Sequence, residues 1–430
     1  MREGPTAIAD EGQQSRTAAE RALLVGLALD PRQRAATESS VAELDQLVRS
    51  AGGTVVGALI QERKRRDPAT LVGRGKVEEI AAVSARTGAH LLVFDDELSP
   101  AQQRNIEQGV GRKTVDRTQL ILDIFARRAS TREGRLQVEL AQLDYLLPRL
   151  SGKGVLLSRL GGGIGTRGPG ETKLETDRRR IRQRIQAVRR EIARVRRARR
   201  TRREARARAD APVVALVGYT NAGKSTLFNA LTHADAVTAD ALFMTLDPLV
   251  RRARLGQGGE VLMVDTVGFI QKLPHALVAA FRATLEEVVE ADLLLHVMDA
   301  SAEDLHEREA AVLRVLDEIG ANARPSIEVL NKIDRVSGAR RAALEAARPE
   351  AVLVSAITGD GIDALRASLS AKLALAPRSV RLRFKTSDTR GIAGVYGSGR
   401  VLAHEVVGEE VTLSVEIPER LLGRYRGHLA

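Results

Sequence analysis

Eight residues from Gly218 to Ser225 (GYTNAGKS) have the composition and spacing of a phosphate-binding loop. Backbone N–H groups of such a glycine-rich turn surround the phosphates, the Lys224 ammonium reaches the β and γ oxygens, and the Ser225 hydroxyl can bind Mg²⁺. The loop needs a strand before it and a helix after it, because a helix N-terminus attracts anions. Apolar residues 212–217 and the helix-like residues 225–231 meet this need. The motif predicts a nucleoside triphosphate site.

Three more motifs follow in order, each after an apolar run, and they identify the base as guanine. Asp265 of the run DTVG can hold Mg²⁺ through a water, and the N–H of Gly268 can sense the γ-phosphate. Asp334 of the run NKID can accept two hydrogen bonds from guanine. Adenine would leave that carboxylate unpaired, which favours guanine by a factor of roughly 10⁴. Ser355 and its neighbours fit the loop that supports the base oxygen. Chance explains any one motif, but not all in this order.

The composition sets limits on the fold and on the chemistry. A chain of 430 residues with 43% hydrophobic residues is long enough for about two to four domains. The chain has no cysteine, which excludes disulfides and thiolate metal sites and fits a reducing cytoplasm. The seven histidines have no ligand spacing, so we expect no zinc site. No stretch approaches the roughly 18 apolar residues that span a bilayer, and the first residues lack a signal core. We expect a cytoplasmic protein without stable membrane insertion.

The positive charge is concentrated in one segment. Residues 178–208 contain 16 Arg and two Glu, which gives the segment a charge of +14, against +12 for the whole chain. A solvated helix face is the simpler explanation. Like charges at i,i+4 spacing repel along a helix, so a polyanionic partner explains the segment better. Arginine favours bidentate phosphate contacts and base stacking, which indicates RNA. The segment lacks the large apolar face of a membrane-bound helix.

The pattern of strands and helices predicts an α/β fold with five parts. They are a disordered start (1–20), a small α/β domain with a mostly parallel sheet (21–116), a helical arm (117–210), a P-loop GTPase domain (211–376) and a small β-rich appendage (377–430). The first domain contains a glycine-rich turn, residues 73–76 (GRGK), at a helix start. Such a turn is a weak indication of phosphate binding.

The helical arm is predicted from two narrow apolar seams. Leu136, Leu140, Leu143 and Leu147 recur at steps of four, three and four, and Ile181, Ile185, Val188, Ile192 and Val195 recur in the same way. Such seams favour an antiparallel helix pair over packing on a globular neighbour. Residues 161–170 between the seams hold six glycines, far more than a reversal needs, together with nearby basic residues. We expect a long tip that faces RNA rather than a simple connector.

Long runs of residues resemble the HflX-type GTPases, a ribosome-associated family. The resemblance covers about residues 20–376 and rests on residues 117–126 (RTQLILDIFA), 136–150 (LQVELAQLDYLLPRL), 162–174 (GGIGTRGPGETKL), 218–231 and 265–287 (DTVGFIQKLPHALVAAFRATLEE). It implies binding of GTP and GDP, a 50S ribosomal subunit with its rRNA as partner, and splitting or rescue of stalled or idle ribosomes. It also implies that ATP binding and RNA remodelling by the N-terminal region is an alternative activity, with residues 73–76 as the place to look. We expect a monomer.

The motifs and the resemblance together define the expected site residues. Those for GTP are Gly218, Tyr219, Thr220, Asn221, Ala222, Gly223, Lys224, Ser225, Thr226, Phe243, Met244, Thr245, Leu246, Asp247, Asp265, Thr266, Val267, Gly268, Asn331, Lys332, Ile333, Asp334, Ser355, Ala356 and Ile357. Mg²⁺ is expected on Ser225 and Thr245, and on Asp265 through water. The family run favours Thr245 over Thr238 as the switch residue. The RNA contacts expected are Arg167, Lys173, Arg178, Arg179, Arg182, Arg189 and Arg196.

The residue after the DTVG run raises a question about catalysis. Many GTPases place a Gln there to orient the attacking water, and this chain has Phe269. One explanation is an inactive switch, in which GTP only controls affinity for RNA. The resemblance implies instead that a hydrophobic residue is usual here and that water is positioned elsewhere. We therefore expect Lys224, Thr245 and Gly268 to act in slow hydrolysis that a partner stimulates, and Phe269→Gln to raise the unaided rate if the missing Gln is the whole reason.

Overall fold

A computed structural model describes residues 20–150, 169–207, 211–232, 242–243, 245, 247–255, 259–272 and 285–430, with the backbone alone for 169–174, 196 and 198–207. Residues 1–19 of the predicted disordered start (1–20) and residues 161–168 of the glycine-rich tip (161–170) lie outside the described residues. The chain divides into two compact units, residues 1–120 and 121–430.

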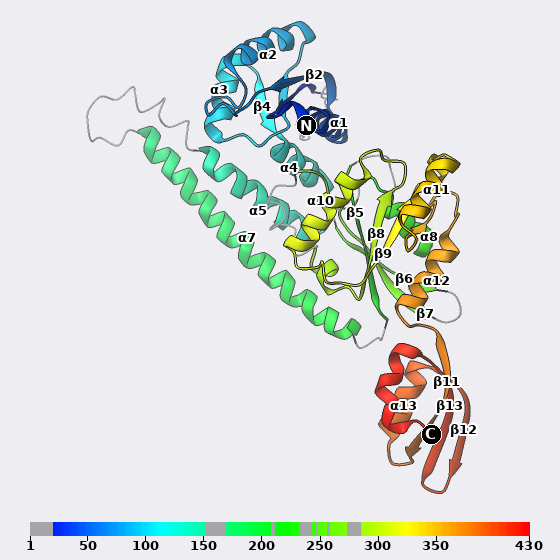
Figure 1. Cartoon of the computed structure of the whole chain (residues 1–430). Helices are drawn as coiled ribbons and strands as arrows, with labels where there is room; N and C mark the ends of the chain where they lie inside the picture. Colours follow the sequence, from blue (N-terminus) through cyan, green and yellow to red (C-terminus); the bar gives the residue numbers. More distant parts are fainter. Residues whose placement is uncertain are drawn as a thin grey trace, which may run out of the picture. The chain divides into compact units, whose positions relative to one another are not determined.

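The first unit contains a sheet of four parallel strands in the order β2-β1-β3-β4. The strands are β1 (Arg21–Ala28), β2 (Thr54–Glu62), β3 (Leu91–Phe94) and β4 (Lys113–Asp116), and the helices are η1 (Pro31–Gln33), α1 (Arg34–Ser50), α2 (Arg74–Thr87) and α3 (Pro100–Val110). Helix α1 lies on one face of the sheet, and α2 and α3 lie on the other (Figure 1). The run LLVF of β3 is fully buried, as expected for a parallel strand covered on both faces. This sheet is wholly parallel, where we expected a mostly parallel one.

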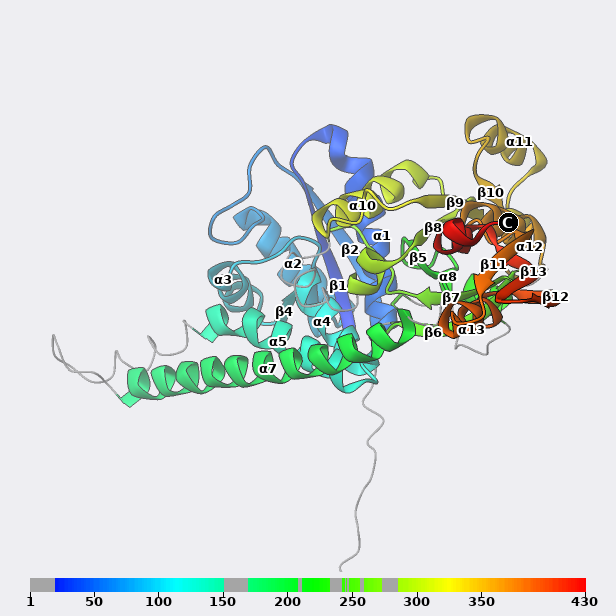
Figure 2. The same ribbon diagram turned by 90° about the horizontal axis from the view of Figure 1, so that it is seen from below.

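Two antiparallel helices form the arm, which confirms the prediction from the apolar seams. Helix α4 (Arg117–Arg128) leads into α5 (Arg132–Arg149), which lies beside α7 (Pro169–Ala207) in both views (Figures 1 and 2). Leu136 of α5 is buried against Val188 and Ile192 of α7. Ion pairs follow the antiparallel order, from Arg132 to Glu191 and from Glu139 to Arg184.

The second unit holds a six-stranded sheet in the order β10-β9-β8-β5-β7-β6. The strands are β5 (Val213–Gly218), β6 (Leu249–Leu255), β7 (Gly259–Asp265), β8 (Leu293–Asp299), β9 (Ser326–Asn331) and β10 (Val352–Leu353). Only the edge strand β6 is antiparallel to its neighbour. Because the other strands are parallel, their carboxyl ends meet at one edge of the sheet, where the loops that follow them can form a shared site.

Helices cover both faces of this sheet (Figure 1). They are α8 (Lys224–Thr232), α10 (Leu305–Glu318), η3 (Ile333–Arg335), α11 (Gly338–Ala347) and α12 (Ile362–Lys372). Phe228 of α8 and Leu365 of α12 pack with Val214 and Leu216 of β5 in the main core. Leu305 of α10 belongs to a second cluster with Met298. Since successive strand residues point to opposite faces, the fully apolar run of β5 serves both layers.

The final segment is a three-stranded antiparallel sheet in the order β11-β13-β12, as its β-rich pattern predicts. Its elements are β11 (Pro377–Lys385), α13 (Thr389–Ser398), β12 (Arg400–Val407), β13 (Glu410–Pro418) and η4 (Glu419–His428). Val395 of α13 and Tyr425 of η4 pack on the inner residues of β11 and β13, such as Leu382 and Leu413.

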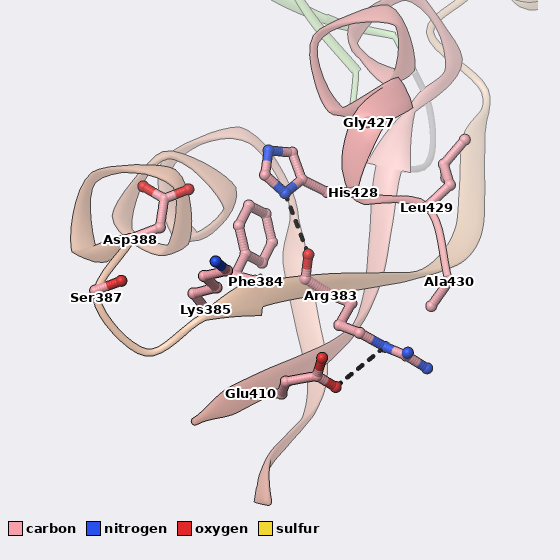
Figure 3. A pocket seen from close by; sticks show the side chains of 10 residues that line it. All are labelled: Arg383, Phe384, Lys385, Ser387, Asp388, Glu410, Gly427, His428, Leu429 and Ala430. Atoms are coloured by element: carbon pink, nitrogen blue, oxygen red, sulfur yellow. Dashed lines mark hydrogen bonds and ion pairs between the residues drawn. The ribbon is translucent and has the colours of Figure 1, made fainter. Parts of the chain in front are cut away.

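A surface pocket of about 770 Å³ lies at the end of this sheet (Figure 3). The ring of His428 stacks on that of Phe384, with 4.3 Å between their centres, and its Nδ1 lies 3.2 Å from the Arg383 carbonyl oxygen. Arg383 in turn faces Glu410, with 3.7 Å between Nε and Oε2. The pocket residues all belong to the appendage, and none comes from the nucleotide motifs.

The helices that the structure describes include none that is both long enough and apolar enough to cross a membrane.

Candidate nucleotide-binding site

The phosphate loop connects the end of β5 to the start of α8, and its backbone requires glycine at two places. Gly218 has φ 151°, and a Cβ there would lie 2.1 Å from the Val297 carbonyl oxygen. Gly223 has φ 88°, and a Cβ there would lie 2.3 Å from the Asn331 amide nitrogen. Both positions therefore exclude side chains, which keeps the loop narrow around a phosphate.

Lys224 lies inside this loop and is only 6% exposed. Its ammonium donates hydrogen bonds to the carbonyl oxygens of Gly218 (3.1 Å) and Tyr219 (2.9 Å). Burial lowers the pKa of Lys224 to about 8, because the charged form loses its hydration. A bound phosphate would supply the missing negative charge. The Lys224 ammonium is therefore positioned to bind an anionic ligand.

Three oxygen-bearing side chains meet beside Lys224. The Ser225 hydroxyl lies 2.9 Å from the Thr245 hydroxyl and 2.7 Å from Asp265 Oδ2, and the Thr245 hydroxyl lies 2.8 Å from the same oxygen. Adjacent ligands of octahedral Mg²⁺ stand about 2.9 Å apart, given bonds of 2.0–2.1 Å. The Ser225 and Thr245 hydroxyls have this spacing, and Asp265 Oδ2 lies within hydrogen-bond distance of both.

Asp265 gives a second sign that the site fits a cation. Its Oδ1 is buried and, among the described residues, has no hydrogen-bond partner. Burial raises the pKa of the Asp265 carboxyl, although Ser225 and Lys224 oppose this effect. A divalent cation would compensate the buried charge. The described residues contain no group of three His, Cys, Asp or Glu side chains that could hold a metal.

The DTVG segment pairs directly with the phosphate loop. The Phe269 N–H donates to the Gly218 carbonyl oxygen (3.1 Å), and the Thr220 N–H donates to that of Phe269 (2.7 Å). A Cβ on Gly268 would lie 3.0 Å from Lys224 Nζ, which places the Gly268 backbone beside the phosphate-binding ammonium. The Phe269 side chain is 1% exposed. The ring is therefore buried and does not face solvent.

The guanine motif is attached to the same loop. The Asn331 amide donates to the Ala222 carbonyl oxygen (2.9 Å), and its oxygen accepts from the Ala356 N–H (3.0 Å). The Asp334 carboxylate accepts from the Ser355 hydroxyl (2.6 Å), which orients it. Asn331 thus joins three loops, and contact of Asp334 with the guanine edge remains a prediction.

Lys332 depends on a residue that the sequence analysis missed. Its ammonium donates to the Asn221 carbonyl oxygen (2.6 Å) and to Asp299 Oδ2 (2.8 Å). Burial alone would raise the pKa of Asp299, but hydrogen bonds from Lys332 and Ser301 lower it. Asp299 ends β8, so its place at the carboxyl edge of the sheet was the available signal.

Most of the predicted GTP residues lie at this edge, but three use their side chains elsewhere. The Thr266 hydroxyl donates to the Leu216 carbonyl oxygen, and the Phe243 ring packs edge-on against Phe125. Asp247 accepts hydrogen bonds from Ser130 and Thr131 of the arm. Nucleotide contact by these three remains a prediction for their backbones. Ile357 is 68% exposed. Thr238, Met244 and Leu246 lie outside the described residues.

Part of the arginine-rich segment of the arm is charge-compensated, contrary to the expectation from the sequence. Arg184 forms two hydrogen bonds with Glu139, and Arg189 lies 3.5 Å from Asp144, so part of the segment is compensated by α5. Sequence reasoning missed these pairs because they join residues about 45 positions apart. Of the other predicted RNA contacts, Arg179 and Arg182 are exposed and Arg178 is half-buried. The side chains of Arg167, Lys173 and Arg196 lie outside the described residues.

Three family models match successive parts of the chain. They are described as GTP-binding GTPase N-terminal (residues 38–126), GTP-binding GTPase Middle Region (128–206) and 50S ribosome-binding GTPase (213–332). Together they follow the first α/β unit, the arm and the nucleotide site.

Curated relatives cover nearly the whole chain. A protein named GTPase HflX from Caldanaerobacter subterraneus subsp. tengcongensis is 45% identical over 95% of this chain and 94% of its own. The GTPase HflX of Escherichia coli K12 is 48% identical over 81% of this chain and 85% of its own. Among solved structures, a GTP-binding protein of Sulfolobus solfataricus in complex with GDP is 24% identical over 82% of this chain and 98% of its own, with a TM-score of 0.42.

Proposed function

Because this chain belongs to the HflX family of GTPases, we propose that it is a slow GTPase whose hydrolysis is accelerated by the large (50S) ribosomal subunit. One observation carries the proposal. The residues that would bind GTP are assembled at the edge of the sheet, whereas Phe269 stands where a water-orienting Gln is often found. A site that binds GTP but does not position the attacking water suits an enzyme whose hydrolysis depends on a partner.

The residues of the chain have separable roles in this proposal. Lys224 binds the β and γ oxygens, and the Gly268 N–H and Thr245 sense the γ-phosphate. Ser225, Thr245 and Asp265 would hold Mg²⁺, which would neutralise charge on the phosphate oxygens. When the γ-phosphate leaves, Thr245 and Gly268 lose a partner, and the segments that carry them relax. This relaxation would release the protein from the ribosome.

The partner is inferred from charge and from family. Exposed arginines of α7, such as Arg179 and Arg182, suit the phosphates of rRNA. The 50S ribosome-binding description belongs to the family model that matches the nucleotide site. We propose that the chain, as a monomer, separates or rescues stalled or idle ribosomes in the cytoplasm.

The test is GTP hydrolysis by the purified protein, alone and with 50S, 30S or 70S particles. We expect slow hydrolysis alone, acceleration by 50S and 70S, and none by 30S. Lys224→Ala, which removes the phosphate-binding ammonium, is the control and should abolish tight GTP binding. Equal rates with all particles would contradict a large-subunit partner, and normal GTP affinity in the variant would contradict the assignment of the loop.

A second function is an RNA-binding switch in which hydrolysis is incidental, and Phe269 favours it. A non-hydrolysable GTP analogue separates the two. If hydrolysis serves release, the analogue supports one round of subunit separation and blocks recycling. A switch without a need for hydrolysis would recycle normally.

The structure gives little support to an ATP site at residues 73–76. The Gly73 N–H donates to the Gln61 side chain (2.9 Å), and Lys76 pairs with Glu79 (2.7 Å). Both groups that would face a phosphate already have partners within their own unit.

A further inference from the structure

The carboxylate of Asp247 binds the start of the arm rather than the nucleotide edge. It accepts hydrogen bonds from the Ser130 N–H (2.9 Å), the Ser130 hydroxyl (2.7 Å), the Thr131 N–H (2.9 Å) and the Thr131 hydroxyl. Thr131 is the N-cap of α5 and accepts from the Gly134 N–H (3.0 Å). An anion at a helix N-terminus is favoured by free N–H groups and by the helix dipole, so this is a strong local attachment.

A second attachment lies on the other side of Thr245. Phe243 is buried, its ring packs edge-on against Phe125 of α4 with 4.6 Å between centres, and its N–H donates to the Thr220 hydroxyl (3.3 Å). Phe243 and Asp247 each stand two residues from Thr245. The segment is therefore fixed to the α4–α5 junction at two points, and Thr245 lies between them beside Ser225 and Asp265.

We propose that Asp247 is a positioning residue that holds Thr245 at the Mg²⁺ and γ-phosphate side of the site by anchoring its segment to the first turn of α5. The inference rests on the proposed function, in which Thr245 senses the γ-phosphate. Because α5 is one of the two helices of the arm, a triphosphate that draws Thr245 inward also favours one placement of the start of the arm. Coupling between two sites is reciprocal. A partner that holds the arm therefore changes the affinity for GTP by the same factor by which GTP changes the affinity for that partner.

Two variants separate positioning from simple helix capping. Asp247→Asn removes the charge and replaces one of the two accepting oxygens with an NH2 group that cannot accept, which weakens the anchor. In Gly134→Ala, the new Cβ would lie 2.4 Å from Asp247 Oδ1, so the carboxylate must move away. Alanine also has the higher helix propensity, so this variant strengthens α5 while it breaks the anchor. Glu139→Gln, which removes an α5–α7 ion pair far from the switch segment, is the matched control.

The measurement is the affinity for GDP and for a non-hydrolysable GTP analogue, with Mg²⁺ present. Both anchor variants should lower the preference for the analogue over GDP by about tenfold, which is the loss of about 1.4 kcal/mol of binding free energy. The control should keep the wild-type preference. In Thr245→Ala the preference is already lost, and adding Asp247→Asn should change it no further. An unchanged preference in both anchor variants, or an additive effect in the double variant, would overturn the proposal.

Hydrogen exchange in the nucleotide-free protein decides whether the anchor exists, whatever the nucleotide does. The amides of Ser130 and Thr131 should exchange faster in both anchor variants and at the wild-type rate in Glu139→Gln. Unchanged exchange in the anchor variants would refute the anchor. If the wild-type protein binds no GTP, the proposed function fails, and the role given to Asp247 fails with it even where the exchange result stands.

Discussion

Phe269 is buried at the point where hydrolysis would need a polar side chain, and this changes what a substitution there should do. A Gln side chain at this buried position would bring a polar amide out of water in place of an apolar ring. We expect Phe269→Gln to lower the free energy of unfolding by about 1–3 kcal/mol and to leave unaided hydrolysis slow. Thermal unfolding and single-turnover hydrolysis measure the two effects.

Phe269→Leu is the control, since it keeps an apolar side chain at this buried position. It should leave hydrolysis at the wild-type rate with a smaller loss of stability. A stable Phe269→Gln protein with fast unaided hydrolysis would show that the missing Gln is the whole reason for slow turnover.

His296 makes the stability of the nucleotide domain depend on pH. It is 5% exposed, and among the described residues its Nε2 has no hydrogen-bond partner. Burial lowers the pKa of His296, although Glu309 and Glu328 oppose this while Arg348 and Lys224 add to it. The unfolded chain therefore binds more protons than the folded one below the ordinary histidine pKa of about 6.5. Stability is full above that pH and falls as the pH drops.

We expect this loss to amount to at most about 1.4 kcal/mol per pH unit, because one proton is involved. Thermal unfolding between pH 7.5 and 5.5 measures it. His296→Leu should flatten this dependence, whereas substitution of the exposed His306 should not. An equally steep dependence in His296→Leu would assign the effect to other groups.

For single residues, motif spacing predicted the charged and hydroxyl side chains at the carboxyl edge of the six-stranded sheet, including Lys224, Ser225 and Asp265. It did not predict Asp299 as the partner of Lys332, or Ser130 and Thr131 as partners of Asp247. Those contacts join residues between 33 and 117 positions apart, and they depend on how the chain folds back rather than on local pattern.

The two arm helices are held together by a narrow apolar seam, so truncation of one seam residue should weaken their pairing. Leu136→Ala would remove buried contact with Val188 and Ile192. We expect the free energy of local opening of α5 to fall by about 2 kcal/mol, the lower end for such a truncation, because the seam is thin. Hydrogen exchange of α5 amides measures this loss.

Leu146→Ala is the matched control in the same helix, since Leu146 is 45% exposed. Its effect should stay within about 0.5 kcal/mol. Equal effects of the two variants would mean that the seam does not hold the helices together.

Among the elements, those with strong periodicity could be predicted, and those defined by their neighbours could not. Both arm helices and apolar strands such as β5 and β7 follow from pattern alone. Strand β6 (LVRRARL) carries three arginines and is a strand only because it pairs with β7 at the sheet edge. Helix α13 contains three glycines and is covered on one side by the appendage sheet, so local propensity did not indicate it.

For the whole molecule, the distribution of charge leads to a prediction about salt. If exposed arginines of α7 contact rRNA phosphates, affinity for the large subunit falls as salt rises, because counterions are released. Replacing both Arg179 and Arg182 with Ala should reduce the slope of log affinity against log salt by about two, since each guanidinium neutralises one phosphate. Subunit binding at several salt concentrations measures the slope.

Arg184→Ala is the control, because its guanidinium is already paired with Glu139. It should leave the slope close to that of the wild-type protein. If none of the three substitutions changes the slope, this part of α7 does not contact the RNA.

The attachment of Asn331 to both Ala222 and Ala356 has a consequence for the order in which products leave. It keeps the base end and the diphosphate end of the site at a fixed separation. A nucleotide held at one end therefore keeps its other end at a high effective concentration beside its own subsite. Inorganic phosphate has no such second attachment once its bond to the β-phosphate is broken. We therefore expect inorganic phosphate to leave before GDP.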